Sequence, residues 1–227
     1  MKEIYGLIKK DALNLGSYKM SIFMMLVCVL IIGSIGQNTC TYIPIIMATM
    51  AGMIGLSTFS YDEISKSENY ILSLPISKKE LVIEKYIFSI IIAILGGLIG
   101  FLITPIFTNI LNNIRPDITL NVDYKVLFIT TLCGIFGISL IISIQIPSIY
   151  KWGAEKGRIQ MFVIIFIIII MVAGIVYLLL KTGLNINLVN INNFFNKFGI
   201  VILLTSLIIM YYISYKISYK IFLKSRK

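Results

Sequence analysis

Residues 60–86 read SYDEISKSENYILSLPISKKELVIEKY and decide how the rest of the chain is arranged. The stretch holds five of the ten acidic residues of the chain, together with four lysines: Asp62, Glu63, Glu68, Glu80, Glu84, Lys66, Lys78, Lys79 and Lys85. Apolar runs at residues 42–59 and 87–111 flank it on both sides. A charged connector between two such runs is typical of a loop that joins two transmembrane helices outside the bilayer.

The composition extends this interpretation to the whole chain. Of its 227 residues, 58% are hydrophobic and only 13% are charged, and the mean hydropathy is +0.95. A bilayer crossing needs about 20 apolar residues, so the pattern predicts six transmembrane helices at residues 20–36, 42–59, 87–111, 126–150, 161–180 and 198–215. We therefore expect an all-α integral membrane protein with no extramembrane segment long enough to form an enzyme domain.

The lysines and arginines predict the orientation of these helices. If the N-terminus is cytoplasmic, the segments on that side hold 16 of the 20 basic residues, and the outside loops hold the other four. The positive-inside rule then places both termini in the cytoplasm. This distribution also accounts for the formal charge of +10, so no nucleic-acid partner is expected.

We expect a single transmembrane domain over residues 1–227. Its predicted parts are an interfacial helix (1–16), spans 1 and 2 (20–59), a cytoplasmic loop (60–86), spans 3 and 4 (87–150), a second cytoplasmic loop (151–160), spans 5 and 6 (161–215) and a basic tail (216–227). In the interfacial helix, apolar residues recur at helical spacing, and Lys9, Lys10 and Asp11 are expected to face away from them. Gly16 and Ser17 are expected to end this helix.

Small residues recur at four-residue spacing inside the predicted spans. The pairs are Ala48 with Gly52, Ala51 with Gly55, and Gly96 with Gly100. Such pairs let helix backbones approach closely. The pattern has two interpretations, packing inside one bundle or contact between two copies of the chain.

Two further features of the spans also have two interpretations each. Met47, Met50 and Met53 form a stripe that is either core packing or the lining of a substrate path, where flexible thioethers would suit varied apolar cargo. Gln145 belongs to the most polar patch inside a span. It either makes a hydrogen bond between helices or contacts a substrate.

Several kinds of chemistry are missing from the sequence. The chain has no histidine and no GxxxxGK[ST] motif with which to bind ATP, and its three cysteines show no pairing that indicates a metal site or a disulfide framework. No ionisable residue lies in the middle of any predicted span, where ion-coupled transporters keep such groups. No catalytic residue, cofactor or metal is therefore expected on this chain, and a partner must supply the energy for any transport.

The charged stretch is where such a partner is expected to act. Ser60 with Glu63 and Ser65 with Glu68 are spaced to cap helices, and a third capping box, Ser77 with Glu80, is expected to begin the helix that leads into span 3. The short helix between them would end at Pro75 and present Glu68, Asn69, Tyr70, Ile71 and Leu74 to the cytoplasm. The alternative is a solvated connector whose mixed charges only keep it soluble.

The same stretch resembles the loop between the second and third spans of small ABC-2 type permeases. The matching elements are Tyr61-Asp62-Glu63, then Ser73-Leu74-Pro75, then the basic pair Lys78 and Lys79, and finally Val82, Lys85 and Tyr86. Within this family, the chain resembles the permease subunits of exporters of phenol-soluble modulins, which are amphipathic peptides; this resemblance implies a bacterial cytoplasmic membrane. Six spans with both termini inside agree with the family over the whole chain.

This resemblance implies an exporter permease that works as a dimer, of two copies or of a copy and a paralogue, bound to two ATP-binding cassette ATPase subunits. The ATPase would bind ATP and magnesium, and the first cytoplasmic loop would seat in it as a coupling helix. The implied coupling residues are Asp62, Glu63, Glu68, Asn69, Tyr70, Ile71, Leu74, Pro75 and, in a second contact, Lys156 and Arg158. The external segment at residues 185–195 would cap the cavity that holds peptide or other hydrophobic cargo.

Three other classes of protein are alternatives to this interpretation. The substrate-binding membrane component of a vitamin importer can also have six spans, but the sequence contains no obvious polar cluster for a vitamin. A membrane-embedded protease or transferase is disfavoured by the lack of histidine and of carboxylates inside the spans. A membrane protein that confers immunity without transport remains an alternative.

Overall fold

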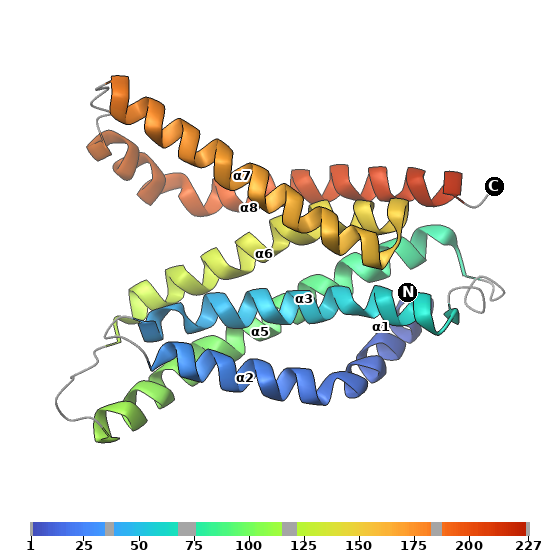
Figure 1. Ribbon diagram of the computed structural model, residues 1–227, viewed down its shortest axis with the longest axis horizontal. Coiled ribbons are helices and arrows are strands. Elements are labelled where there is room, and N and C mark those ends of the chain that lie inside the picture. Colours follow the sequence, from blue (N-terminus) through green and yellow to red (C-terminus); the bar gives the residue numbers. More distant parts are fainter. Residues whose placement is uncertain (1, 35–38, 68–75, 115–121, 183–187, 226–227) are drawn as a thin grey trace.

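The computed structural model describes residues 2–34, 39–67, 76–114, 122–182 and 188–225 (Figure 1). The long helices are α1 (Lys2–Leu15), α2 (Lys19–Gly33), α3 (Ile43–Ile64), α5 (Lys78–Ile114), α6 (Tyr124–Trp152), α7 (Ala154–Thr182) and α8 (Leu188–Ser225), with short 3₁₀ helices η1 (Gly16–Tyr18) and η2 (Thr39–Tyr42). Every regular element within these ranges is helical, which confirms the all-α prediction.

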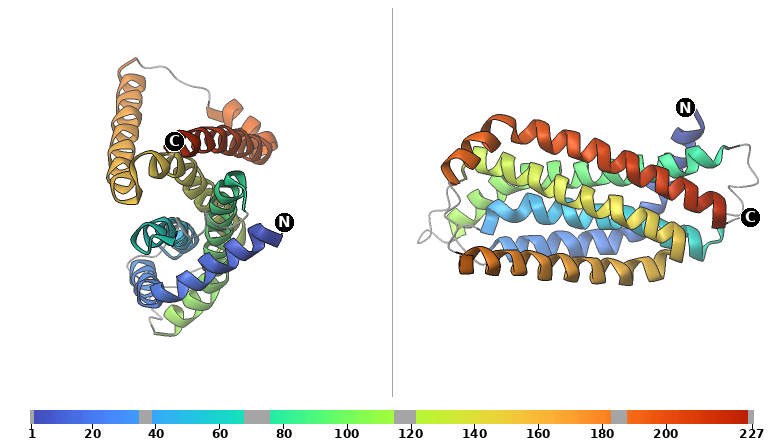
Figure 2. Two further views of the ribbon diagram at one scale, coloured as in Figure 1. Left: turned by 90° about the vertical axis from the view of Figure 1, so that its right-hand side faces the viewer. Right: turned by 90° about the horizontal axis from the view of Figure 1, so that it is seen from above.

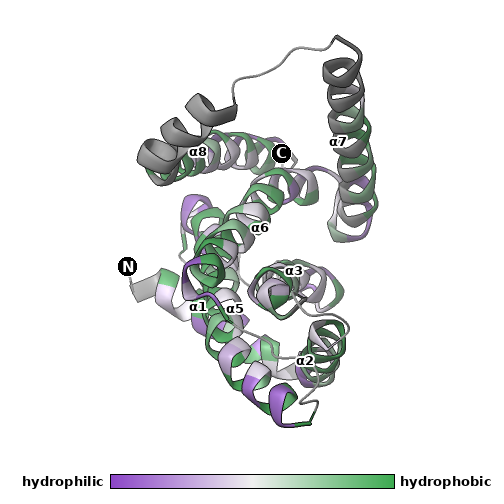
Figure 3. Cartoon of the chain, turned by 90° about the vertical axis from the view of Figure 1, so that its left-hand side faces the viewer, coloured by the Kyte–Doolittle hydropathy of each residue, from purple (hydrophilic) through white to green (hydrophobic). Residues whose placement is uncertain are grey.

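The long helices have the length and composition of membrane spans. Within the described residues, Cys40–Ile64, Lys78–Ile114 and Tyr124–Trp152 are each long and apolar enough to cross a membrane. A fourth span results if the bent pair Ile4–Leu15 and Lys19–Gly33 is counted as one. Apolar residues dominate the long helices (Figure 3), and many, such as Leu102 and Ile129, are exposed as lipid contact requires. The chain is therefore a multi-pass membrane protein, while its six spans stay a prediction.

Helices α2, α3, α5, α6, α7 and α8 lie lengthwise and run in alternating directions (Figures 1 and 2). As a result, the segments expected to be cytoplasmic gather at one end of the bundle. We call this the charged end; it comprises α1, the last turns of α3, α6 and α8, and the first turns of α5 and α7.

Both flanks of the charged stretch are helical. Helix α3 continues past the predicted run to Ile64, and α5 already begins at Lys78. The predicted capping box at the start of α5 is confirmed, because the Ser77 backbone N–H donates to Glu80 Oε2 over 3.0 Å and the Glu80 N–H donates to Ser77 Oγ over 3.3 Å. The expected helix over residues 68–75 lies outside the described residues.

Helix α1 ends where the sequence predicts, but the prediction that Asp11 faces away from its apolar side is wrong. Gly16 begins η1, and the axes of the helices on either side differ by 69°. Asp11, expected to face away from the apolar side, is instead completely buried. The physical reason is helical spacing: Asp11 follows Leu7 by four residues and Ile8 by three, so it lies on the same face as they do.

Helices α3 and α5 pack closely because glycines leave room between them. A Cβ atom on Gly100 of α5 would lie 2.7 Å from the Cα of Pro44, and one on Gly96 would lie 2.7 Å from the Met47 carbonyl oxygen. Gly52 of α3 approaches Ile138 of α6 in the same way. Packing within one chain therefore explains the small-residue pattern.

Helix α6 supplies the centre of the core. Ile138, Ile142 and Ile146 are completely buried and cluster with residues of α3 and α5 such as Ala48 and Val82. Helix α7 contacts α6 and α3, whereas α8 contacts α6 and α5. The charged end is thus assembled on a core to which all these helices contribute.

We expect Gly96→Ala to destabilise the protein, because the added methyl group would overlap Ala51 and the Met47 backbone. Overpacking of this kind costs about 1–3 kcal/mol, which lowers the melting temperature of the purified protein in detergent. Gly137→Ala is the matched control, since a Cβ atom there meets no atom within 4 Å. Equal melting temperatures for the two variants would contradict the packing described here.

Candidate functional site

Four charged side chains form a closed ring of ion pairs where α1, α3 and α5 meet. Lys10 Nζ lies 3.1 Å from Asp11 Oδ1 and 2.7 Å from Asp62 Oδ1. Lys85 Nζ lies 2.5 Å from Asp11 Oδ2 and 2.6 Å from Asp62 Oδ2. We call these four residues the ion-pair ring. Each aspartate uses both carboxylate oxygens, and each lysine joins both aspartates, so the ring is electrically neutral.

The ion-pair ring is largely shielded from its surroundings. The Asp11 side chain is 0% exposed, those of Lys85 and Asp62 are 9% and 10% exposed, and only Lys10 reaches 29%. Lys85 also donates to Thr58 Oγ1 over 3.5 Å, and its Nζ lies 5.1 Å from the centre of the Phe59 ring. Removing one member of such a buried network by mutation lowers the stability of the fold by about 3–5 kcal/mol, because it leaves a buried charge uncompensated.

A second contact joins α3 to the turn between α6 and α7. Glu63 Oε2 accepts a hydrogen bond of 2.9 Å from the backbone N–H of Ala154, the first residue of α7. A carboxylate at a helix N-terminus satisfies a free N–H group and interacts favourably with the helix dipole. Gly153 makes this turn with a φ of 87°, and a Cβ atom there would lie 2.9 Å from Glu63 Oε1. The two predicted cytoplasmic segments therefore touch each other.

The start of α5 is also bonded to α8. The Tyr86 hydroxyl is 2.5 Å from Ser214 Oγ and 2.8 Å from Ser218 Oγ. Ser214 in turn donates to the carbonyl oxygen of Ser143 on α6. Lys85 and Tyr86 thus connect α5 to helices from both halves of the chain.

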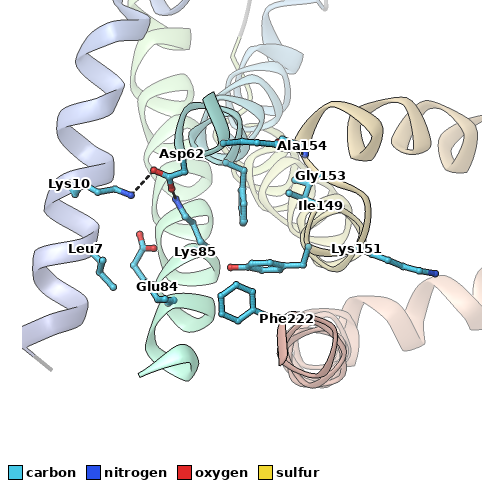
Figure 4. Close-up of a pocket in the computed structure, with 14 residues that line it drawn as sticks. Leu7, Lys10, Asp62, Glu84, Lys85, Ile149, Lys151, Gly153, Ala154 and Phe222 are labelled. Atoms are coloured by element: carbon cyan, nitrogen blue, oxygen red, sulfur yellow. Dashed lines mark hydrogen bonds and ion pairs between the residues drawn. The ribbon is translucent and has the colours of Figure 1, made fainter. Parts of the chain in front are cut away.

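A cavity of about 270 Å³ lies beside the ion-pair ring (Figure 4). It is lined by Leu7, Lys10, Phe59, Asp62, Glu63, Leu81, Glu84, Lys85, Ile149, Tyr150, Lys151, Gly153, Ala154 and Phe222. Its wall is therefore mixed, with charged groups from α1, α3, α5 and α6 and apolar or aromatic groups from α1, α3, α5, α6, α7 and α8.

The predicted coupling residues fall into three groups: two residues of α3, two residues of α7, and residues that lie outside the described part of the chain. Asp62 and Glu63 lie at the charged end, where Asp62 belongs to the ion-pair ring and Glu63 binds the start of α7. Lys156 is exposed on the first turn of α7, and Arg158 follows on the same helix, although its side chain is outside the described part. Glu68, Asn69, Tyr70, Ile71, Leu74 and Pro75 also lie outside the described residues.

The candidate path residues differ in their surroundings. Met47 is buried against α5 and η2, Met50 packs at the edge of the same cluster, and Met53 is 37% exposed. Gln145 is buried, and its Oε1 accepts no hydrogen bond from the described residues. Their assignment to a substrate path stays a prediction. Of residues 185–195, those from Leu188 onward form the first turns of α8.

Sequence reasoning missed part of this site. Lys85 and Tyr86 were noticed only as the end of the family motif, and Asp11 was assigned to the solvent side. The signal for Asp11 was its place between Leu7 and Leu15 on an apolar face, because an acidic residue there requires a buried cationic partner. Which cation serves as that partner depends on how α1 packs on α5.

The sequence matches the family described as ABC-2 family transporter protein over residues 6–223. The chain belongs to this family. No curated protein and no solved structure matches it significantly. Membership makes the chain an ABC-2 permease, the membrane component of an ABC transporter, in a family whose members generally work with an ABC ATPase. The permease assignment from the charged stretch is thereby confirmed.

We expect Lys85→Met to destabilise the permease by about 3–5 kcal/mol, because two buried aspartates would then share one lysine. The double variant Lys85→Met/Asp62→Asn leaves Lys10 with Asp11 as a neutral pair and should recover part of the loss. Lys79→Met, an exposed site on the same helix, is the control. Melting temperatures test this, and a double variant as unstable as the sum of its singles would contradict the ion-pair ring.

Gly153→Ala should loosen the joint between α3 and α7, since it strains a backbone with positive φ and crowds Glu63. The expected cost is about 1–3 kcal/mol, seen as a lower melting temperature that Gly174→Ala, with no atom within 4 Å of its added Cβ, does not cause. Because Glu63→Ala removes the same contact, the double variant should lose less stability than the two singles together. If the stability loss of the double variant equals the sum of the losses of the two single variants, the contact between Glu63 and the start of α7 is contradicted.

Proposed function

We propose that this permease forms the translocation path of an exporter that a separate ATP-binding cassette ATPase drives. In this proposal it crosses the cytoplasmic membrane of a bacterium six times, with both termini in the cytoplasm. The charged end then faces the ATPase, which binds ATP and magnesium. Family membership and the absence of a P-loop from the sequence support this division of labour.

The observation that carries the proposal is the linkage of the helices on both sides of residues 68–75. Helix α3 enters this segment and α5 leaves it, and the ion-pair ring joins Asp62 at the end of α3 to Lys85 near the start of α5. A partner that displaces residues 68–75 would therefore move α3 and α5 together. Packed elements with discrete contacts transmit such displacements better than a free connector does.

The second cytoplasmic segment supports the same proposal. The hydrogen bond from the Ala154 N–H to Glu63 joins α7 to α3. A displacement of either cytoplasmic segment would therefore move the other. Asp62, buried in the ion-pair ring, would act by positioning α3. Ile64 is 83% exposed and Lys156 is also exposed, so both are free of the core and accessible to an ATPase surface.

We propose amphipathic peptides or other hydrophobic compounds as the cargo, moved along a path between two permease copies or between this permease and a paralogue. Exposed apolar side chains occur on every long helix in the described part of the chain, including Met53 of α3 and the exposed faces of α5. Surfaces of this kind suit membrane-active cargo, because such molecules already partition into lipid.

The proposal is tested by purifying the permease together with the ATPase encoded beside it. Glu68→Lys and Tyr70→Ala should each weaken complex formation at least ~10-fold, equivalent to about 1.4 kcal/mol of interface energy, and should reduce ATP-driven transport of a labelled amphipathic peptide into vesicles. Tyr124→Ala, at an exposed tyrosine on the opposite end of the bundle, is the matched control. The permease alone should hydrolyse no ATP.

Unchanged complex formation and unchanged transport in both variants would disprove coupling through residues 68–75. ATP hydrolysis by the isolated permease would overturn the division of labour itself.

A further inference from the structure

Glu84 is buried beside an ion-pair ring whose charges already balance, and burial raises the pKa of its carboxyl group to about 8. The ion-pair ring is already neutral, with two lysines and two aspartates. Glu84 is only 2% exposed, takes part in no ion pair among the described residues, and its Oε1 accepts no hydrogen bond there. A buried carboxylate without a donor is costly. At pH 7 the carboxyl group therefore holds a proton most of the time, and a bound cation is the alternative that balances its charge.

The cations nearby are committed to other partners. Lys10 and Lys85 complete the ion-pair ring, and Asp11, which Lys85 binds, lies close to Glu84. Lys151 points away from the cavity (Figure 4), with its Nζ 4.2 Å from the centre of the Trp152 ring. The other acidic residue of the wall, Glu63, already accepts the Ala154 N–H.

The cavity beside Glu84 offers room and a suitable wall. Its volume is about 270 Å³, close to the lower limit for small-molecule pockets. Phe59, Leu81, Ile149 and Phe222 supply apolar and aromatic surface, and Glu84 lines the same space. Aromatic faces attract organic cations, and an apolar wall favours a ligand whose charge sits at one end of a hydrocarbon body.

We propose that this cavity binds an organic ammonium ion with an apolar body about the size of a phenylalkylamine. Its ammonium group donates to Glu84, and its body lies among Phe59, Leu81 and Phe222. A metal ion fits less well, because no group of three or more metal-ligating side chains occurs in the part of the chain that the structure describes. The site goes beyond the proposed function, since it assigns a ligand to the permease itself and needs no ATPase.

The test uses the full-length permease in nanodiscs of uncharged phosphatidylcholine and follows binding of radiolabelled 4-phenylbutylamine, with empty nanodiscs subtracted. Binding is measured at pH 9, where Glu84 is mostly ionised and the amine, like a lysine side chain, is still mostly protonated. It should bind at least ~10-fold tighter than 4-phenylbutan-1-ol, which has the same body without the charge, as expected for one charge-assisted hydrogen bond. Glu84→Gln should abolish that preference.

Glu80→Gln is the matched control, because it removes the same charge one turn earlier on α5 and keeps a residue that a capping box accepts. Equal binding of amine and alcohol, or an amine preference that survives Glu84→Gln, would overturn the proposal. So would the absence of saturable amine binding, the result expected if Glu84 holds only a proton. If Glu84→Gln does not fold, Leu81→Trp fills the cavity without changing its charge, and unchanged amine binding in that variant would overturn the proposal equally.

Discussion

The arrangement of the charged end depends on the ion-pair ring. Buried charges are stable only when each has partners on every side, because little solvent is present to replace a missing one. The ring meets this condition with two lysines that each bridge the same two aspartates. Since its members come from α1, α3 and α5, their mutual satisfaction holds the interfacial helix against the two helices that flank the charged stretch.

Helix α5 combines three environments along its length, and this explains its unusual sequence. Its first turns carry the capping box, Lys85 and Tyr86, which bind charged or hydroxyl partners. Its middle turns carry the glycines that let α3 approach. Its remaining surface is apolar and exposed, as lipid contact requires. The charged start of α5 is therefore continuous with the turns that pack closely against α3.

The cavity and Glu84 add a second property to the charged end. A neutral ring beside a further buried carboxyl group separates helix packing from ligand binding. The ring holds helices together, and Glu84 remains available to a ligand at the wall of a space with aromatic sides. Mechanical linkage and ligand binding can then lie next to each other in the same permease.

Much of this protein could be predicted from local sequence. Hydrophobic runs predicted membrane helices, the Ser77 and Glu80 spacing predicted the start of α5, and the motif in residues 60–86 predicted the permease family. These features are local because capping, helix periodicity and hydropathy depend on residues within a few turns of one another. Helical spacing also places Asp11 on the buried face, because it follows Leu7 by four residues and Ile8 by three.

The tertiary structure alone decided which groups became partners. Lys85 binds Asp11 across 74 residues, the Ala154 N–H reaches Glu63 across 91, and Tyr86 meets Ser218 across 132. It also assigned the small-residue pattern to the contact of α3 with α5. No periodicity encodes these pairings, because they depend on which helix faces meet once all the helices pack around α6. By itself, the sequence determined the helices and predicted their orientation and an outside energy source; the packing determined which charges pair in the ion-pair ring and that Glu84 is buried beside them.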